Sequence, residues 1–149
     1  MCQTKSKEVH ETDNDIICYK VLMEKDGEYF ATFQGYTYHV GEEYTDMNFE
    51  EIYKTENGFT IASGFYHFFA KKEDADRLAK ELSKAYSRNN DIEVVAECTI
   101  PKGTRVSEGK FHIGFSHTIL DNMQSICAKS FKLDKVLNKY KNGKKDLLH

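Results

Sequence analysis

The chain has 149 residues, of which 40% are hydrophobic and 30% charged, and its formal net charge is −3. This length fits one domain that buries its own hydrophobic core. The apolar runs fall short of the roughly 18–20 residues that span a bilayer, and the polar N-terminus lacks the apolar centre of a secretory signal. We therefore expect a cytoplasmic protein without a membrane partner.

The first half of the chain predicts strands after a polar start. Residues 1–15 are mostly charged or polar and predict a flexible leader. The apolar run at 16–23 predicts a central strand, and the Lys-Asp-Gly sequence at 25–27 predicts a hairpin turn. We expect a second strand over 28–34 and a short one over 36–40, because side chains alternate between two faces there.

An amphipathic helix is the clearest element of the second half. Apolar residues recur at helical spacing over 72–88, with acidic residues near the start and basic residues near the end. Residues 92–100 alternate as a strand with one buried face. This pattern leaves Glu93 and Glu97 on the face toward water.

The remaining segments complete the predicted fold. Residues 126–133 predict the last strand, and the polar, glycine-bearing segment 109–122 predicts a loop. The whole pattern predicts an α+β fold, with a small mixed or mainly antiparallel sheet of about six short strands packed on the helix at 72–88. We expect a single domain over 16–133, followed by a basic C-terminal tail over 134–149.

Four cysteines are widely spaced, and the lack of a CxxC pair excludes a zinc ribbon or a thioredoxin-type motif. Cys18, Cys98 and Cys127 fall in strand-like segments, which predicts buried, reduced thiols. The spacing of His112, His117 and Cys127 does not exclude a structural zinc site, but no helical His-x-x-x-His pattern supports one. We expect no metal and no cofactor.

Aromatic, glycine and histidine residues concentrate at 33–44 and again at 64–69. Tyrosine suits a binding surface because its ring buries a large area while its hydroxyl stays in water. The acidic segment 42–56 would give such a surface a negative rim, which favours a basic partner. The candidate partner-binding or ligand-binding residues are Tyr36, Tyr38, His39, Tyr44, Tyr66 and His67.

Two questions about this candidate surface stay open. Most of the rings could instead fill the core of a domain that has no tryptophan. Strand alternation also places Tyr36 and Tyr38 on one face and His39 on the other. His39 therefore joins their pocket only if Gly35 or Gly41 bends the strand.

Several short segments occur in a distinctive order. They are Tyr19-Lys20 in the first strand, aromatic-Gly-aromatic and Val-Gly-x-x-Tyr sequences within 34–44, Gly64-Phe65-Tyr66-His67 before the helix, a Glu-Val-rich strand at 93–97, and Ala128-Lys129. This order resembles a family of short phage and prophage proteins of unknown function. The resemblance covers roughly residues 18–133 and departs from the family at the inserted Tyr66 and the longer segment 107–125. It implies a mobile-element or bacterial accessory protein that binds another factor, and it supplies no catalytic residue.

The chain contains no phosphate-binding glycine loop, nucleophile elbow or helical zinc motif. It therefore predicts a small cytosolic binding protein that contacts a protein partner or a small ligand and has no catalytic residue. A homo-oligomer is compatible with this prediction, whereas nucleic acid is not expected because the body of the chain is acidic. The alternative is a nucleotide-binding or ADP-ribosyl-type nucleotide-modifying domain, with His39, His67 and the tyrosines lining its pocket.

Overall fold

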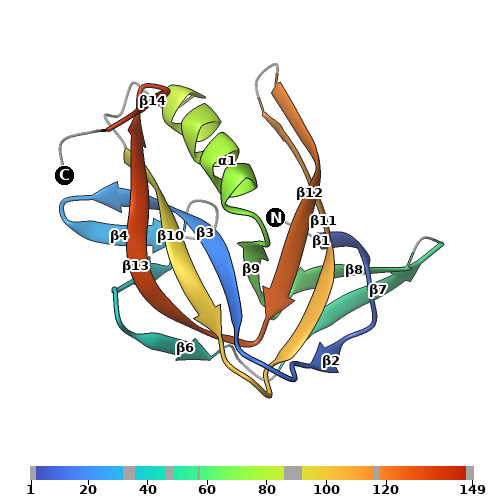
Figure 1. Cartoon of the computed structure of the whole chain (residues 1–149). Helices are drawn as coiled ribbons and strands as arrows, with labels where there is room; N and C mark the ends of the chain where they lie inside the picture. Colours follow the sequence, from blue (N-terminus) through green and yellow to red (C-terminus); the bar gives the residue numbers. More distant parts are fainter. Residues whose placement is uncertain are drawn as a thin grey trace.

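The computed structural model describes residues 3–31, 36–45, 49–56, 58–85, 92–115 and 118–146, apart from the side chains of 4–5, 112–115 and 118–122. Strands dominate these ranges, and α1 (Lys72–Ala85) is the helix found in them (Figure 1). The strands are β1 (Gln3–Ser6), β2 (His10–Glu11), β3 (Ile16–Lys25), β4 (Glu28–Ala31), β5 (Thr37–Tyr38), β6 (Glu43–Thr45), β7 (Glu51–Thr55), β8 (Gly58–Ser63), β9 (Tyr66–Phe69), β10 (Ile92–Ile100), β11 (Arg105–Phe115), β12 (Thr118–Ala128), β13 (Ser130–Lys141) and β14 (Lys144–Lys145).

The described strands form one continuous sheet in the order β14-β13-β10-β3-β9-β12-β11-β1-β8-β7. Four strands lie beside this path: β2 pairs with β11, β4 pairs with β3, β5 pairs with β4, and β6 pairs with β13. The strand β9 joins the two halves of the sheet, because it pairs antiparallel with β3 on one side and with β12 on the other. The expected α+β fold with a small sheet of six strands is therefore wrong, since the protein is mostly β and its antiparallel sheet is large.

Two predicted strands and one predicted turn are confirmed. The strands β3 and β10 occupy the segments where the sequence predicts strands. A turn at Asp26 and Gly27 joins β3 to β4, and both residues have positive φ angles, of 53° and 80°. These φ values are those of a tight hairpin turn whose twist matches that of the flanking strands.

The hairpin of β11 and β12 departs most from the sequence prediction. Its two long strands occupy the segment expected to be a loop. Polar and glycine residues hide the strand alternation here. Packing explains the glycine at position 109, because a Cβ there would lie 2.8 Å from side-chain atoms of Gln3 on β1.

Both segments expected to flank the domain contain strands of the same sheet. Gln3, in the expected leader, is fully buried and donates from Nε2 to the main-chain oxygen of Ser107 and to Oγ of Ser125. At the other end, β13 continues to Lys141 and pairs with β10, so much of the expected basic tail belongs to the sheet. The boundaries expected at 16 and 133 thus correspond to no break in the sheet.

The central strands β3 and β10 are buried on both faces. Leu22 and Ala96 pack in one core, whereas Val21 and Val95 pack on the opposite face against α1. Glu93 shares the face of Val95 and is 1% exposed. The expectation that this face of β10 meets water is therefore wrong at Glu93, because α1 covers the face there, whereas Glu97 is partly exposed.

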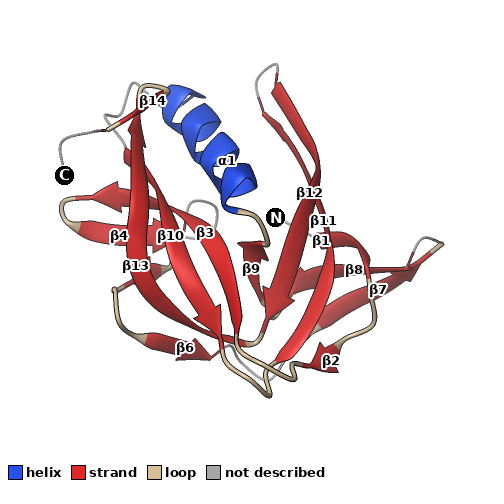
Figure 2. Ribbon diagram, in the orientation of Figure 1, coloured by secondary structure: helices blue, strands red, loops and turns tan. Residues whose placement is uncertain are grey.

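Helix α1 forms where the sequence predicts it, and residues 86–88 of the expected helix lie outside the described ranges. It lies across the sheet between β13 and the β11–β12 hairpin (Figure 2). Asp76 fixes the helix to β13, because its Oδ1 accepts hydrogen bonds from Asn138 Nδ2 at 2.9 Å and from the Tyr140 hydroxyl at 3.0 Å. The buried apolar stripe of α1 consists of Ala75, Leu78, Ala79 and Leu82.

Candidate binding pocket

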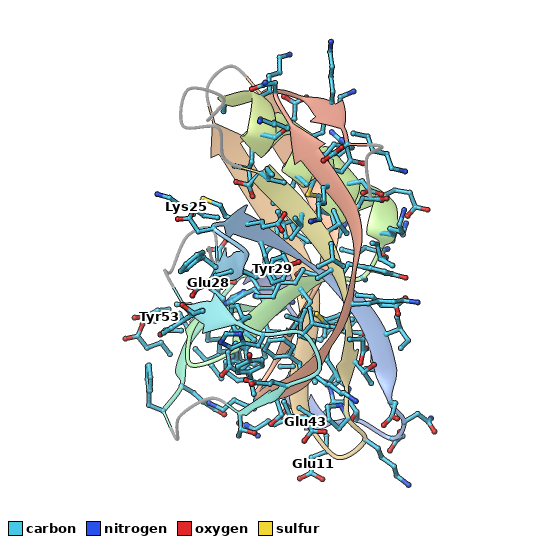
Figure 3. All side chains as sticks on the ribbon, turned by 90° about the vertical axis from the view of Figure 1, so that its left-hand side faces the viewer. Glu11, Lys25, Glu28, Tyr29, Glu43 and Tyr53 are labelled. Atoms are coloured by element: carbon cyan, nitrogen blue, oxygen red, sulfur yellow. The ribbon has the colours of Figure 1, made fainter. Side chains whose placement is uncertain are left out.

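A pocket of about 280 Å³ opens where β5 and β6 face the turn between β8 and β9. Three of its lining residues, Thr37, Thr45 and Ser63, carry aliphatic hydroxyls. Figure 3 shows Glu43 of β6 and Tyr53 of β7 with their side chains at the surface of the molecule. The remaining side chains of the lining are aromatic, namely Tyr36, Tyr38, Tyr44, Phe49, Phe65 and Tyr66.

The pocket floor is built around Phe131 of β13. The ring centroids of Tyr38, Tyr44 and Tyr66 lie 5.7, 5.2 and 4.8 Å from that of Phe131. Tyr44 stacks on Phe131, whereas Tyr38 and Tyr66 meet it edge to face. Each such aromatic pair contributes about 0.5–1.5 kcal/mol beyond its buried area. The cluster therefore holds three of the candidate tyrosines in fixed positions.

The hydroxyl of Tyr44 fixes the turn between β5 and β6. It accepts a hydrogen bond from the main-chain N–H of His39 at 2.6 Å and donates to Oε2 of Glu42 at 3.2 Å. Burial raises the pKa of Tyr44, the His39 N–H opposes the rise and the charge of Glu42 adds to it. The phenol thus stays neutral at neutral pH, and this wall carries no phenolate charge.

The opposite wall depends on Gly64 and Lys129. Gly64 has a φ of +85°, and a Cβ there would lie 2.0 Å from the main-chain oxygen of Phe49. Lys129 donates from Nζ to the main-chain oxygens of Phe49 and Gly64, at 3.1 and 2.5 Å, and lies 5.1 Å from the centroid of the Phe65 ring. The wall is therefore a close contact of two chain segments that one ammonium group holds together.

A bidentate ion pair anchors the segment that follows Phe49. Arg105 donates from Nε and from a terminal nitrogen to the two carboxylate oxygens of Glu50, at 2.6 and 3.0 Å. The hydrogen bonds from Arg105 lower the pKa of Glu50, and the same bonds raise the pKa of Arg105. The pair keeps the start of β7 against β11, next to the pocket.

A buried lysine lies behind the floor of the pocket. Lys20 donates from Nζ to the main-chain oxygen of His67 at 3.0 Å, and its Nζ lies 5.9 Å from the Tyr38 ring and 5.0 Å from the Phe68 ring. Burial lowers the pKa of Lys20, and the neighbouring thiol of Cys98 opposes this shift. Strand alternation along β3 puts Lys20 on the same face as the core residues Cys18 and Leu22. This alternation is the sequence signal that could have revealed that Lys20 is buried.

The three thiols of the described chain are buried, as the sequence predicts. Cys18 and Cys98 lie opposite each other in the ladder of β3 and β10. Burial raises the pKa of Cys18 well above its ordinary value and that of Cys98 to about 12. Both groups therefore stay protonated and are poor nucleophiles at neutral pH.

Neither candidate histidine lines the pocket. His39 is exposed, on the turn after β5. His67 is 5% exposed, its Nδ1 lies 3.2 Å from Sγ of Cys127, and its Nε2 has no hydrogen-bond partner among the described residues. Burial lowers the pKa of His67 to about 3, with the charge of Lys20 adding to the shift. The imidazole is therefore neutral and enclosed, which does not suit it to proton transfer with a ligand.

The structure thus brings Tyr36, Tyr38, Tyr44 and Tyr66 together in the pocket lining, which includes neither His39 nor His67. Sequence reasoning missed Phe49 and Phe65, which complete the aromatic lining, and Phe131, on which three of the lining tyrosines pack. The separation of Tyr66 from His67 follows from strand alternation along β9. Nothing local in the sequence indicates that Phe131, on a distant strand, forms the floor.

The described residues contain no group of three His, Cys, Asp or Glu side chains that could hold a metal ion. The zinc alternative involved His112, whose side chain is outside the description, and His117, which lies outside the described ranges. Within those ranges, no helix has the length and apolar character needed to cross a membrane.

Comparisons with known proteins give no match: no family model, no curated protein and no solved structure is significantly similar to this chain.

Proposed function

We propose that this protein is a binding protein that holds a partner polypeptide at the aromatic pocket and the surface around it. The observation that supports this most strongly is where its apolar side chains are exposed. Among the large hydrophobic side chains exposed in the described ranges, Tyr36, Val40, Phe49 and Tyr53 belong to one segment, and Ile17 lies apart. The same segment supplies six of the ten residues that line the pocket, and exposed apolar side chains beside a pocket are typical of protein interaction sites.

The extent of this surface favours a polypeptide over a small molecule. A pocket of about 280 Å³ is at the lower limit of the roughly 300–1,000 Å³ typical of drug-sized ligands. Val40 and Tyr53 are exposed but do not line the pocket, so a small ligand inside it would leave them in water. A peptide with one anchoring side chain in the pocket could cover them as well.

Open strand edges near the pocket also support a polypeptide partner. In the described part of the chain, β7 pairs on one side only, with β8, and β5 pairs only with β4. An unpaired edge offers main-chain N–H and C=O groups to an added strand. We infer that the partner segment is extended where it crosses this surface.

The nucleotide alternative gains no support from this geometry. It required His39 and His67 to line the pocket with the tyrosines, and neither does. The three buried free thiols favour action in the reducing cytoplasm. The resemblance to short phage and prophage proteins favours a mobile-element origin.

Selection from a random peptide library tests the proposed function without knowledge of the natural partner. Peptides that the wild-type protein enriches should bind the double variant Tyr36→Ala, Phe49→Ala about tenfold more weakly or worse, because exposed aromatic anchors dominate such interfaces. The control is Ile17→Ala, since Ile17 is 51% exposed and Phe49 49%. Equal binding to all three proteins, or no enrichment at all, would contradict the proposal.

A further inference from the structure

We infer that the pocket receives a neutral aromatic side chain of the partner, in preference to a cationic or an anionic one. This inference rests on the proposed function, because it identifies the group that anchors the partner polypeptide. Three sets of contacts carry it: the arrangement of the rings, the ammonium groups behind them, and the carboxylates at the entrance.

The lining is shaped for a flat ring. Tyr38 and Tyr44 stand nearly perpendicular, at 88° with centroids 5.0 Å apart, and Tyr38 and Tyr66 make an angle of 70° at 6.5 Å. Rings at such angles turn edges and faces in different directions along the lining of the pocket. An entering aromatic ring can then meet one neighbour edge to face and another in an offset stack, the two favoured geometries of aromatic pairs.

The protein's own amino groups already lie against two of the six rings of the lining that a cation could use. Nζ of Lys20 lies 5.9 Å from the centroid of Tyr38, and Nζ of Lys129 lies 5.1 Å from that of Phe65. Both rings line the pocket. A second cation against the same rings would be repelled by these ammonium groups and would share ring electrons that already attract them. An arginine or lysine side chain is therefore a poor occupant.

The entrance disfavours an anion. Glu42, Glu43 and Glu51 are exposed on the turn, on β6 and on β7, next to residues that line the pocket. Glu42 is fixed there by its hydrogen bond with the Tyr44 hydroxyl. A carboxylate or phosphate would approach like charges before it reached the rings. These carboxylates suit a basic partner segment that surrounds an uncharged anchor.

The hydroxyl groups of the lining refine the inferred chemistry. Thr37, Thr45 and Ser63 offer donors and acceptors at the wall of an otherwise aromatic pocket. A phenol O–H or an indole N–H on the edge of the ring could bond to one of them. Tyrosine and tryptophan side chains therefore fit better than phenylalanine.

Amino-acid probes separate these possibilities on the intact chain. The probes are the N-acetyl amides of tryptophan, tyrosine, arginine and aspartate, titrated by saturation-transfer NMR. Because the chain contains no tryptophan, indole fluorescence gives an independent signal for the first probe. We expect the tryptophan and tyrosine probes to bind saturably, with dissociation constants at least about tenfold below those of the two charged probes.

Two exposed tyrosines provide the matched variants. Tyr36 is 59% exposed and lines the pocket, whereas Tyr53 is 58% exposed and does not. Tyr36→Ala should weaken the tryptophan probe several-fold, and Tyr53→Ala should leave its affinity unchanged. Arginine binding as tight as tryptophan binding, no saturable binding of either aromatic probe, or equal effects of the two variants would overturn the inference.

The library peptides distinguish failure of this inference from failure of the proposed function. If the selected peptides lose binding to the Tyr36→Ala, Phe49→Ala variant but tolerate replacement of their aromatic residues by arginine, the inference is wrong and the proposed function stands. If aromatic replacement by leucine or arginine abolishes binding, the inference is supported.

Discussion

Lys20 donates a hydrogen bond from its buried Nζ to the main-chain oxygen of His67, 3.0 Å away. This bond joins β3 to β9, the strand that connects the two halves of the sheet. The same ammonium group lies behind Tyr38, so it belongs both to the core and to the floor of the pocket. The stability of this protein should therefore respond to the protonation of Lys20.

We predict that Lys20→Met changes the pH dependence of stability. The pKa of Lys20 is lowered from 10.5 in the folded protein, so the unfolded chain binds the proton more tightly. The free energy of unfolding should then rise as the pH increases toward 10.5, by at most about 1.4 kcal/mol per pH unit. Lys20→Met should lack this rise.

Chemical denaturation of both proteins at several pH values from about 7 to 10 measures the difference. The raised pKa values of Cys18 and Cys98 lower stability as the pH rises through and above 9.0, their ordinary value. The charge of Lys20 lowers the pKa of both thiols, so this fall should be at least as steep in Lys20→Met and adds to the difference between the two profiles. Parallel pH profiles would show that Lys20 is not buried as described.

A second prediction concerns His67 in acid. Its pKa is about 3 in the folded protein against an ordinary value of 6.5, so between these values the unfolded chain binds more protons. The free energy of unfolding should therefore fall as the pH drops from 6.5 toward 3, by up to about 1.4 kcal/mol per unit. His67→Gln should remove this component of the acid sensitivity. His39→Gln is the control, because it makes the same substitution at an exposed histidine on the turn after β5.

A third prediction compares two glycines with similar backbone angles. Gly64 and Gly27 have φ values of +85° and +80°, but only the Cβ at Gly64 would collide, 2.0 Å from the main-chain oxygen of Phe49. Gly27→Ala should cost about 1 kcal/mol from backbone strain alone. Gly64→Ala should cost more and weaken the tryptophan probe, because the pocket wall must move. Urea unfolding and probe titration measure the two effects, and equal costs with unchanged binding would contradict this description of the wall.

A fourth prediction separates the pocket floor from the core. Phe131 and Phe111 are both buried, but only Phe131 contacts the tyrosines of the pocket. Phe131→Leu and Phe111→Leu should each lower the free energy of unfolding by about 1–2 kcal/mol. Only Phe131→Leu should also weaken probe binding, since Tyr44 loses the ring on which it stacks. Equal loss of binding in both variants would indicate a global effect instead.

The sequence predicts those elements whose periodicity is uninterrupted. The helix and the strands β3 and β10 carry clear apolar repeats, and the turn at Asp26 and Gly27 has a specific signature. The hairpin of β11 and β12 was missed because its strands are long, polar and interrupted by glycine. Gly109 reads as a break in the sequence, yet it is present because Gln3 packs against it.

Short sequence patterns predict the candidate site only in part, as they do the fold. Local density of tyrosine indicates which residues gather, but the sequence analysis placed Tyr66 and His67 in one candidate site, and only Tyr66 lines the pocket. The floor at Phe131 and the cation at Lys20 depend on which distant strands become neighbours in the sheet. That information lies in long-range pairing, which short patterns do not contain.

The most direct test of the central claim is a map of amide shifts in the isotope-labelled protein as a library-selected peptide is added. A partner held at the aromatic pocket predicts that the largest shifts fall in β5, β6 and the turn between β8 and β9, around Tyr38, Tyr44 and Gly64. Shifts concentrated instead on α1 or on the lysine-rich strands β13 and β14 would contradict it.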